Sequence, residues 1–180
     1  MVVSAPTRSW REQDGVIYFS VTSDGTTGEE WIKRLDGKGF SVGYYAKQIL
    51  RSSDFKPTKS VTTEIAVLKG LLFTDDDRST ENIRAEACRR RLTKLNAETA
   101  CLIREKFTDE ELEAMGLWWV VVMHKPIKDS GGSPSLLYAN RDGLGRRLGA
   151  CDGNPDDIGD RDSGFAFAVS RKCSPLCLGS

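Results

Sequence analysis

The fold prediction for this chain depends on the stretch MGLWWVVVMHKPIKDS, which runs from Met115 to Ser130. In a regular strand, successive side chains point to opposite faces of the sheet. A strand over 117–125 would be apolar on both faces, which is typical of the interior of a sheet. We therefore predict a central strand that ends before Pro126. The side chains that alternate along it are Trp118, Val120, Val122 and His124 on one face, and Leu117, Trp119, Val121 and Met123 on the other.

Other segments of alternating or continuous apolar residues predict further strands. The last of them, GFAFAVS (164–170), has no polar alternation, so we expect it inside the sheet as well. LLYANRDGLGRRLGAC has the pattern of a hairpin between loops rich in Gly and Asp. The predicted strands, besides the central one, span 15–23, 61–73, 136–140, 147–151 and 164–170.

Helical spacing of apolar residues, together with capping signals, predicts five helices. Thr27 with Glu30, and Thr108 with Glu111, have the spacing of a capping box, in which each residue of the pair bonds the backbone of the other. Ser79 can cap another helix. The predicted helices begin near residues 27, 42, 79, 96 and 108, with Asn96 as the cap of the fourth.

These elements predict an α+β fold with a mainly antiparallel sheet of about five or six strands and the helices packed on one face. The order of the elements lacks the regular strand–helix alternation of a doubly wound domain. A chain of 180 residues is long enough for one domain with a sizeable core. We expect a flexible lead over 1–14, a single domain over 15–170 and a flexible tail over 171–180.

Composition narrows the range of partners. The chain has 26 basic and 26 acidic residues, so no overall positive field would gather nucleic acid or an anionic membrane. No apolar run approaches the roughly 20 residues that span a bilayer. Five cysteines, an odd number, fit a reducing compartment better than a disulfide framework. We predict a cytoplasmic protein without membrane contacts and without a cofactor.

His124, the only histidine, is predicted to lie at the end of the central strand beside a loop, where open sheets often bind ligands. We predict a small-molecule pocket there, to which the 136–151 hairpin contributes. An alternative is a hydrolase-type enzyme that uses His124 as general acid or base. Another alternative is a histidine with a purely structural role. The predicted ligand-binding residues are His124, Lys125, Asp129, Arg141 and Asp142.

Two metal sites are weighed against simpler interpretations. The loop 152–162 alternates acidic residues like a calcium loop, but Asp157 stands where the turn needs glycine, and Ser163 stands where glutamate belongs. A solvated turn is the safer interpretation. A zinc site would need ligands scattered along the chain, so we predict no metal. Its candidate ligands are His124, Cys151, Cys173 and Cys177.

A basic cluster lies where two predicted helices meet: Arg89, Arg90, Arg91 and Lys94. Two helices joined by a short turn suggest a helix-turn-helix motif, so a nucleic-acid-binding regulator is another alternative. Acidic residues dilute this charge, and the would-be recognition helix lacks side chains that read bases. We therefore consider nucleic acid an unlikely partner and the cluster a solvated helix face.

The tryptophans and tyrosines exceed what one layer of helices on one sheet face needs. A second apolar face requires a cover, and a second copy of the chain can supply it. We therefore predict a small homo-oligomeric binding or regulatory module, most simply a homodimer. Its predicted interface residues are Trp118, Trp119 and Tyr138.

Four segments carry a resemblance: GTTGEEWIKRL, TTEIAVLKGLLF, AETACLIREKFTDEELEAMGLWWVVVMHKPIKDS and GFAFAVS. Together they resemble a family of uncharacterised bacterial proteins of the kind found in metagenomic and mobile-element sequences. The likeness covers most of the chain. It implies a bacterial, cytoplasmic origin, and it carries over no activity and no catalytic residue.

Overall fold

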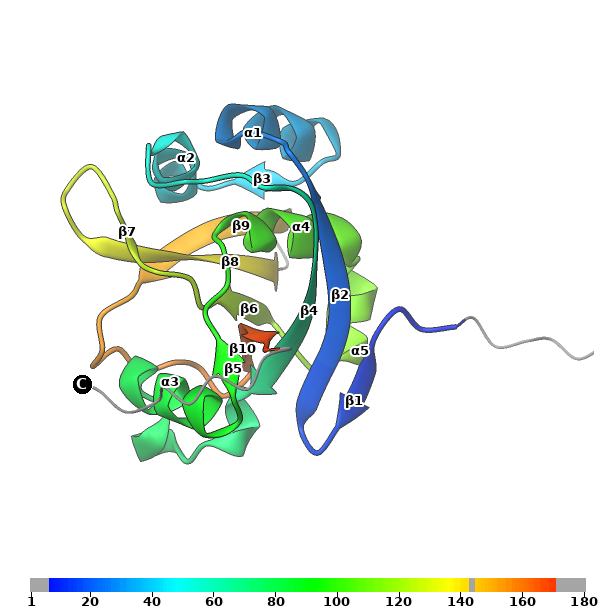
Figure 1. The fold of residues 1–180 in the computed structure, drawn as a ribbon, viewed down its shortest axis with the longest axis vertical. Helices are drawn as coiled ribbons and strands as arrows, with labels where there is room; N and C mark the ends of the chain where they lie inside the picture. The colour runs from blue at the N-terminus through cyan, green and yellow to red at the C-terminus, as the bar shows by residue number, and fades with distance from the viewer. Residues whose placement is uncertain (1–6, 143–144, 171–180) are drawn as a thin grey trace, which may run out of the picture.

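A computed structural model describes residues 7–142 and 145–170 as an α+β fold, in which helices pack on both faces of one ten-stranded sheet (Figure 1). The strand order is β1-β2-β4-β10-β6-β8-β9-β3, with β5 added to β10 and β7 added to β8. The strands are β1 (Arg11–Gln13), β2 (Val16–Asp24), β3 (Ser41–Val42), β4 (Lys59–Lys69), β5 (Leu92–Thr93), β6 (Trp119–Val122), β7 (Ile127–Lys128), β8 (Pro134–Asp142), β9 (Gly145–Asp152) and β10 (Ser163–Val169). The helices are α1 (Gly28–Gly37), α2 (Tyr44–Arg51), α3 (Thr80–Arg89), α4 (Glu98–Lys106) and α5 (Asp109–Ala114), with two 3₁₀ turns at η1 (Gly70–Leu72) and η2 (Asp75–Asp77).

The tryptophan-rich segment forms an interior strand, as predicted. β6 lies between β10, to which it is parallel, and β8, to which it is antiparallel. Val120 and Val122 belong to the core on one face of the sheet, and Met123 belongs to the core on the other. The strand is shorter than the predicted 117–125, because the neighbouring residues bond outside the regular ladder: the Trp118 N–H donates to the Asp162 carbonyl.

The prediction that the helices pack on one face is wrong for α3. α1, α2, α4 and α5 cover the first face, whose core includes the alternating residues Ile17, Phe19 and Val21 of β2. The other face of β4 and β10 is apolar too, so it needs a cover. Ile83 and Ala87 of α3 belong to the same buried cluster there as Phe165 and Phe167 of β10. In Figure 1, α1 and α2 lie at the top of the view and α3 at the bottom.

The sheet is mostly antiparallel, as predicted, but two pairs are parallel: β6 with β10, and β3 with β9. It also has ten strands rather than five or six. The additional strands β1, β3, β5 and β7 have two or three residues each, which is too short for any periodicity to appear in the sequence. Their positions depend on long-range pairing.

Residues 7–14, the described part of the segment 1–14 that is predicted as a flexible lead, contribute to the domain. β1 pairs antiparallel with β2, and Trp10 is buried in the first-face core. Trp10 thereby removes a large apolar side chain from water, which keeps this segment on the sheet. The predicted tail, 171–180, lies outside the described residues.

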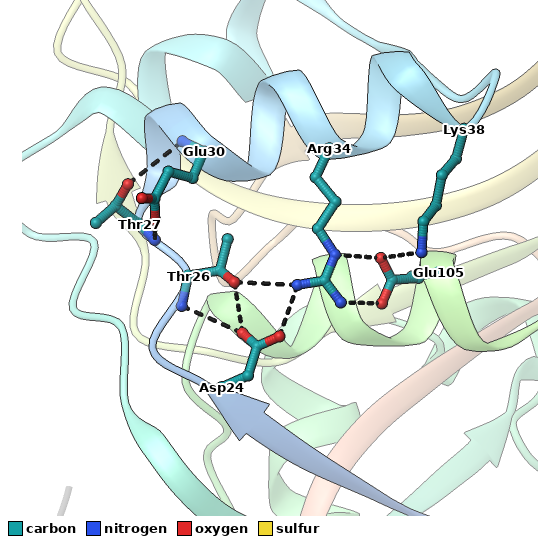
Figure 2. Close-up of polar contacts among 7 residues, drawn as sticks. All are labelled: Asp24, Thr26, Thr27, Glu30, Arg34, Lys38 and Glu105. Atoms are coloured by element: carbon teal, nitrogen blue, oxygen red, sulfur yellow. Dashed lines mark hydrogen bonds and ion pairs between the residues drawn. The ribbon is translucent and has the colours of Figure 1, made fainter.

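Both predicted capping boxes are present. Thr27 and Glu30 bond each other's backbone at the start of α1, as Figure 2 shows, and Thr108 and Glu111 do the same at α5. The Ser79 side chain accepts from the Asn82 N–H at α3. Asn96 departs from the prediction by one residue: the N-cap of α4 is Ala97, while the Asn96 side chain accepts from the Glu98 N–H.

A polar network centred on Arg34 joins α1 to α4 and to the end of β2 (Figure 2). The Arg34 guanidinium donates two bonds to Glu105, at 2.5 and 2.6 Å, and one to Asp24 at 2.6 Å. Lys38 adds a bond of 2.9 Å to Glu105. The hydrogen bond from Arg34 is the main cause that lowers the pKa of Asp24 to about 2. Paired, planar contacts of this kind are among the stronger ion pairs in proteins.

We predict that Arg34→Gln lowers the free energy of unfolding by about 1 to 2 kcal/mol, because it leaves the half-buried Glu105 without its bidentate partner. The control is Arg51→Gln, which removes a pair with Glu29 whose two side chains are 55% and 53% exposed. That variant should change stability much less, because an ion pair that lies largely in water contributes little. Urea unfolding measures both, and equal losses would contradict the prediction.

Candidate functional site

His124 is buried and makes two hydrogen bonds to the backbone. Its Nε2 accepts from the Leu137 N–H at 3.0 Å, because a backbone amide can only donate. The proton of the neutral ring is therefore on Nδ1, which donates to the Lys125 carbonyl at 2.7 Å. Both ring nitrogens are thus occupied by backbone groups: Nε2 by the amide of Leu137 in β8, and Nδ1 by the carbonyl of the residue that follows His124.

Burial also sets the charge of this ring. Desolvation lowers the pKa of His124 from 6.5 to about 4, with a further contribution from the positive charge of Arg84. The ring is thus neutral near pH 7, and protonation would turn Nε2 from an acceptor into a donor that faces the Leu137 N–H. A general acid or base needs a ring nitrogen within reach of a substrate. The geometry of His124 instead favours a structural role.

The structure does not bring the five predicted ligand-binding residues together. Arg141 lies four residues beyond Leu137 on β8, about 13 Å from the His124 contact at roughly 3.3 Å per residue. Its Nε donates to the Leu117 carbonyl at 2.8 Å, at the other end of β6. Asp142 is paired with Gly145 in the β8–β9 hairpin. The antiparallel pairing of β6 with β8 separates the two groups.

Lys125 and His124 do line a hollow at the end of β6. We call it the strand-end pocket; its volume is about 310 Å³. Asp129 does not line it, because its Oδ1 accepts from the Gly131 and Ser133 N–H groups in the turn before β8. The strand-end pocket is lined by Asp54, Lys56, Leu95, Asn96, Ala97, His124, Lys125, Pro126 and Ile127.

A second hollow lies on the sheet face that α3 covers, and we call it the second-face pocket. Its volume is about 280 Å³. Its apolar walls come from four strands, β6, β8, β9 and β10, and from the loop that precedes β10. The residues that line it are Thr80, Trp119, Val121, Met123, Leu136, Cys151, Asp152, Asp157, Ile158, Gly159, Asp160, Ser163 and Phe165.

The rim of the second-face pocket is the acidic loop, residues 152–162, which α3 holds in place. Thr80 and Glu81, at the start of α3, donate their N–H groups to the carbonyls of Asp157 and Pro155 at 2.9 and 3.0 Å. The loop carbonyls thus satisfy donors that a helix start leaves open. Gly159 allows the loop to approach the sheet, because a Cβ there would lie 2.4 Å from the Phe165 ring. The loop is a built wall of the pocket.

The calcium alternative gains no support from the arrangement of the acidic loop. Among the residues that the structure describes, no cluster of three or more acidic, histidine or cysteine ligands could hold a metal ion. The zinc alternative has no better support, since both ring nitrogens of His124 are bonded and Cys173 and Cys177 lie outside the described residues. The Asp157 side chain accepts instead from the Asn154 N–H at 2.9 Å.

The two helices α3 and α4 do not form the helix-turn-helix motif raised as an alternative. α3 packs on the second face of the sheet and α4 on the first, with β5 between them in the chain, whereas the two helices of that motif are joined directly by a short turn. Arg89 and Arg90 both pair with Glu86 on the surface of α3, as a solvated helix face would.

The three predicted interface residues have different surroundings. Trp118 is 42% exposed, and the Arg141 guanidinium lies 4.0 Å from the centre of its ring. Trp119 is half-buried in the second-face pocket, and its ring centre is 4.6 Å from that of Tyr138. Tyr138 is buried over Gly149, where any side chain would overlap its ring. Of the three, Trp118 is the one that a partner could reach.

Sequence reasoning missed the second-face pocket. The alternation of the central strand places Trp119, Val121 and Met123 on one face, which is a partial signal for a pocket. Leu136, Cys151 and Phe165 come from three other strands. Only the order and register of the strands place these three residues beside Trp119, Val121 and Met123.

No family model, curated protein or solved structure is significantly similar to this chain. The resemblance to bacterial mobile-element proteins therefore stays a prediction, as does the cytoplasmic location. Across 7–142 and 145–170, no helix has the length and apolar character needed to cross a bilayer.

We predict that His124 makes the fold sensitive to mild acid. Its pKa is about 4 in the fold and 6.5 in an unstructured peptide, so the unfolded chain binds the proton first as pH falls. The free energy of unfolding should therefore decrease between pH 6.5 and 4, by at most about 1.4 kcal/mol per unit. Urea unfolding across this range, compared with His124→Gln, isolates the effect because the chain has one histidine. Equal slopes in the two proteins would contradict the assignment.

Proposed function

We propose that this chain is a small-molecule-binding module whose ligand occupies the second-face pocket. The observation that carries the proposal is the composition of the pocket: an apolar floor built from four strands, with a few polar groups gathered along one rim. Small-molecule sites in proteins typically have this composition. The volume, about 280 Å³, suits a molecule with one ring or a short branched chain.

The second-face pocket is favoured over the strand-end pocket because its walls are free to meet a ligand. Trp119 and Val121 are half-buried, so part of each side chain faces the hollow. In the strand-end pocket, the His124 ring is committed to the backbone, and the Asn96 amide donates to the Lys56 carbonyl at 2.7 Å. A ligand there would compete with bonds that the fold already uses.

Binding is favoured over catalysis by the state of His124 and Cys151, a candidate base and a candidate nucleophile. His124 is buried and neutral, with both nitrogens occupied. Cys151 lines the second-face pocket, but burial raises the pKa of its thiol to about 12. A thiolate is the reactive form of cysteine, so this thiol is a poor nucleophile near neutral pH.

We predict that neutral one-ring fragments perturb Trp119 and leave Trp118 unchanged. In ¹H–¹⁵N NMR spectra, the indole N–H of Trp119 and the backbone amide of Val121 should shift as fragment is added. Val121→Phe extends a side chain into the hollow and should abolish these shifts, while thermal unfolding confirms that this variant folds. Trp118→Ala, which changes the exposed neighbour, should bind as the parent does. Shifts confined to His124 and Lys125, or no shifts at all, would contradict the proposal.

Self-association is a second proposal, and the exposure of Trp118 supports it. A large apolar ring that is 42% exposed at the end of the sheet can bury more of its surface against a second copy. Light scattering after gel filtration should show a dimer that Trp118→Ser shifts toward monomer, while Tyr45→Ser, at another exposed aromatic residue, has no effect. A parent protein that is monomeric at about 100 μM, a concentration at which a specific dimer of micromolar affinity is populated, would contradict this proposal.

A further inference from the structure

The second-face pocket has a negative rim without a matching cation. Three of its lining residues, Asp152, Asp157 and Asp160, carry carboxylates, and no described lining residue is basic. None of the three forms an ion pair with a described lysine or arginine, although many other acids on the molecule do. The imbalance is local, because the chain as a whole has equal numbers of basic and acidic residues.

The basic residues Arg78 and Arg161 lie at or in the acidic loop, but neither forms an ion pair with a carboxylate of the rim. Arg78 is buried, and its guanidinium donates to the carbonyls of Gly70, Phe73 and Gly159 and to the carboxylate of Asp75. Arg161 follows Asp160 in the chain but is exposed and does not line the pocket. The start of α3 is positive, and the backbone carbonyls of the loop face it. The Asp157 carboxylate accepts from the Asn154 N–H, and the carboxylates of Asp152 and Asp160 remain available to a ligand.

The negative charge reaches the pocket wall. Burial is the main cause of the raised pKa of the Cys151 thiol, and the charges of Asp152 and Asp157 raise it further. A group at the wall of the pocket therefore senses both carboxylates. Water is partly excluded from the hollow by its apolar floor, so a charged ligand group would interact with them more strongly than on an open surface.

We propose that the ligand of the second-face pocket is a small primary amine with an aromatic or branched aliphatic body. The body would lie against Trp119, Val121 and Phe165, and the ammonium group would lie at the rim formed by Asp152 and Asp160. The inference rests on the proposed binding function and adds the charge of the ligand to it. A cation over Trp119 would gain a further attraction from the face of the ring.

The test compares three probes with the same phenyl body and different charge: 2-phenylethylammonium, 2-phenylethanol and 3-phenylpropanoate. Their affinities are measured by titration of the Trp119 indole N–H signal in NMR spectra of the whole chain. We expect the ammonium probe to bind about fivefold more tightly than the alcohol, and the carboxylate to bind least, since each exposed ion pair contributes little. The preference should shrink in about 0.5 M salt.

The variants separate the rim from the rest of the acidic loop. Asp152→Asn and Asp160→Asn should each reduce the preference for the ammonium probe by about two- to threefold and leave the alcohol unaffected. Asp156→Asn removes a charge from the same loop at a residue that does not line the pocket, so it should change neither affinity. Equal binding of the ammonium and alcohol probes would overturn the amine inference and leave the proposed binding function standing. No binding of any probe would overturn both.

Discussion

The structure depends on the burial of two central strands, β6 and β10, whose side chains are apolar on both faces. A strand of this kind is stable only where the sheet continues on each side of it and another layer covers each face. The first requirement is met by β4 and β8, and the second by four helices on one face and by α3 on the other. The cover on the second face is completed by the acidic loop, and the hollow that this cover encloses is the second-face pocket.

Local signals in the sequence predict the individual elements well. Both capping boxes, at Thr27 and Thr108, are where their spacing indicates, since a capping box needs four consecutive residues and no information from the rest of the chain. β2 is also recognisable, because a strand with one buried face repeats every second residue. Strand order is not predictable in this way. The pairing of β10 with both β4 and β6 joins residues far apart in the sequence, and the two-residue strands have no pattern at all.

The candidate site likewise has features that the sequence predicts and features that depend on the pairing of strands. His124 attracts attention in the sequence because it is the only histidine and ends an apolar run, yet the signal does not distinguish a reactive ring from a buried one. The distinction depends on Leu137, which lies thirteen residues after His124 in a different strand. Its N–H donates to the His124 ring. The sequence also suggests Arg141 as a neighbour of His124, because both are polar and near strand ends. The antiparallel register of β6 and β8 places them at opposite ends.

The position of β10 has a consequence for the order in which the protein can fold. Among the described strands β10 is synthesised last, but it fills the middle of the sheet, between β4 and β6. Until it emerges from the ribosome, those two strands have no common neighbour, and each exposes unpaired backbone groups along an apolar edge. Such edges readily pair with other chains. A nascent chain that stalls before Ser163 would therefore carry two unpaired strand edges that can aggregate with other chains. Synthesis of β10 pairs both edges and closes the sheet.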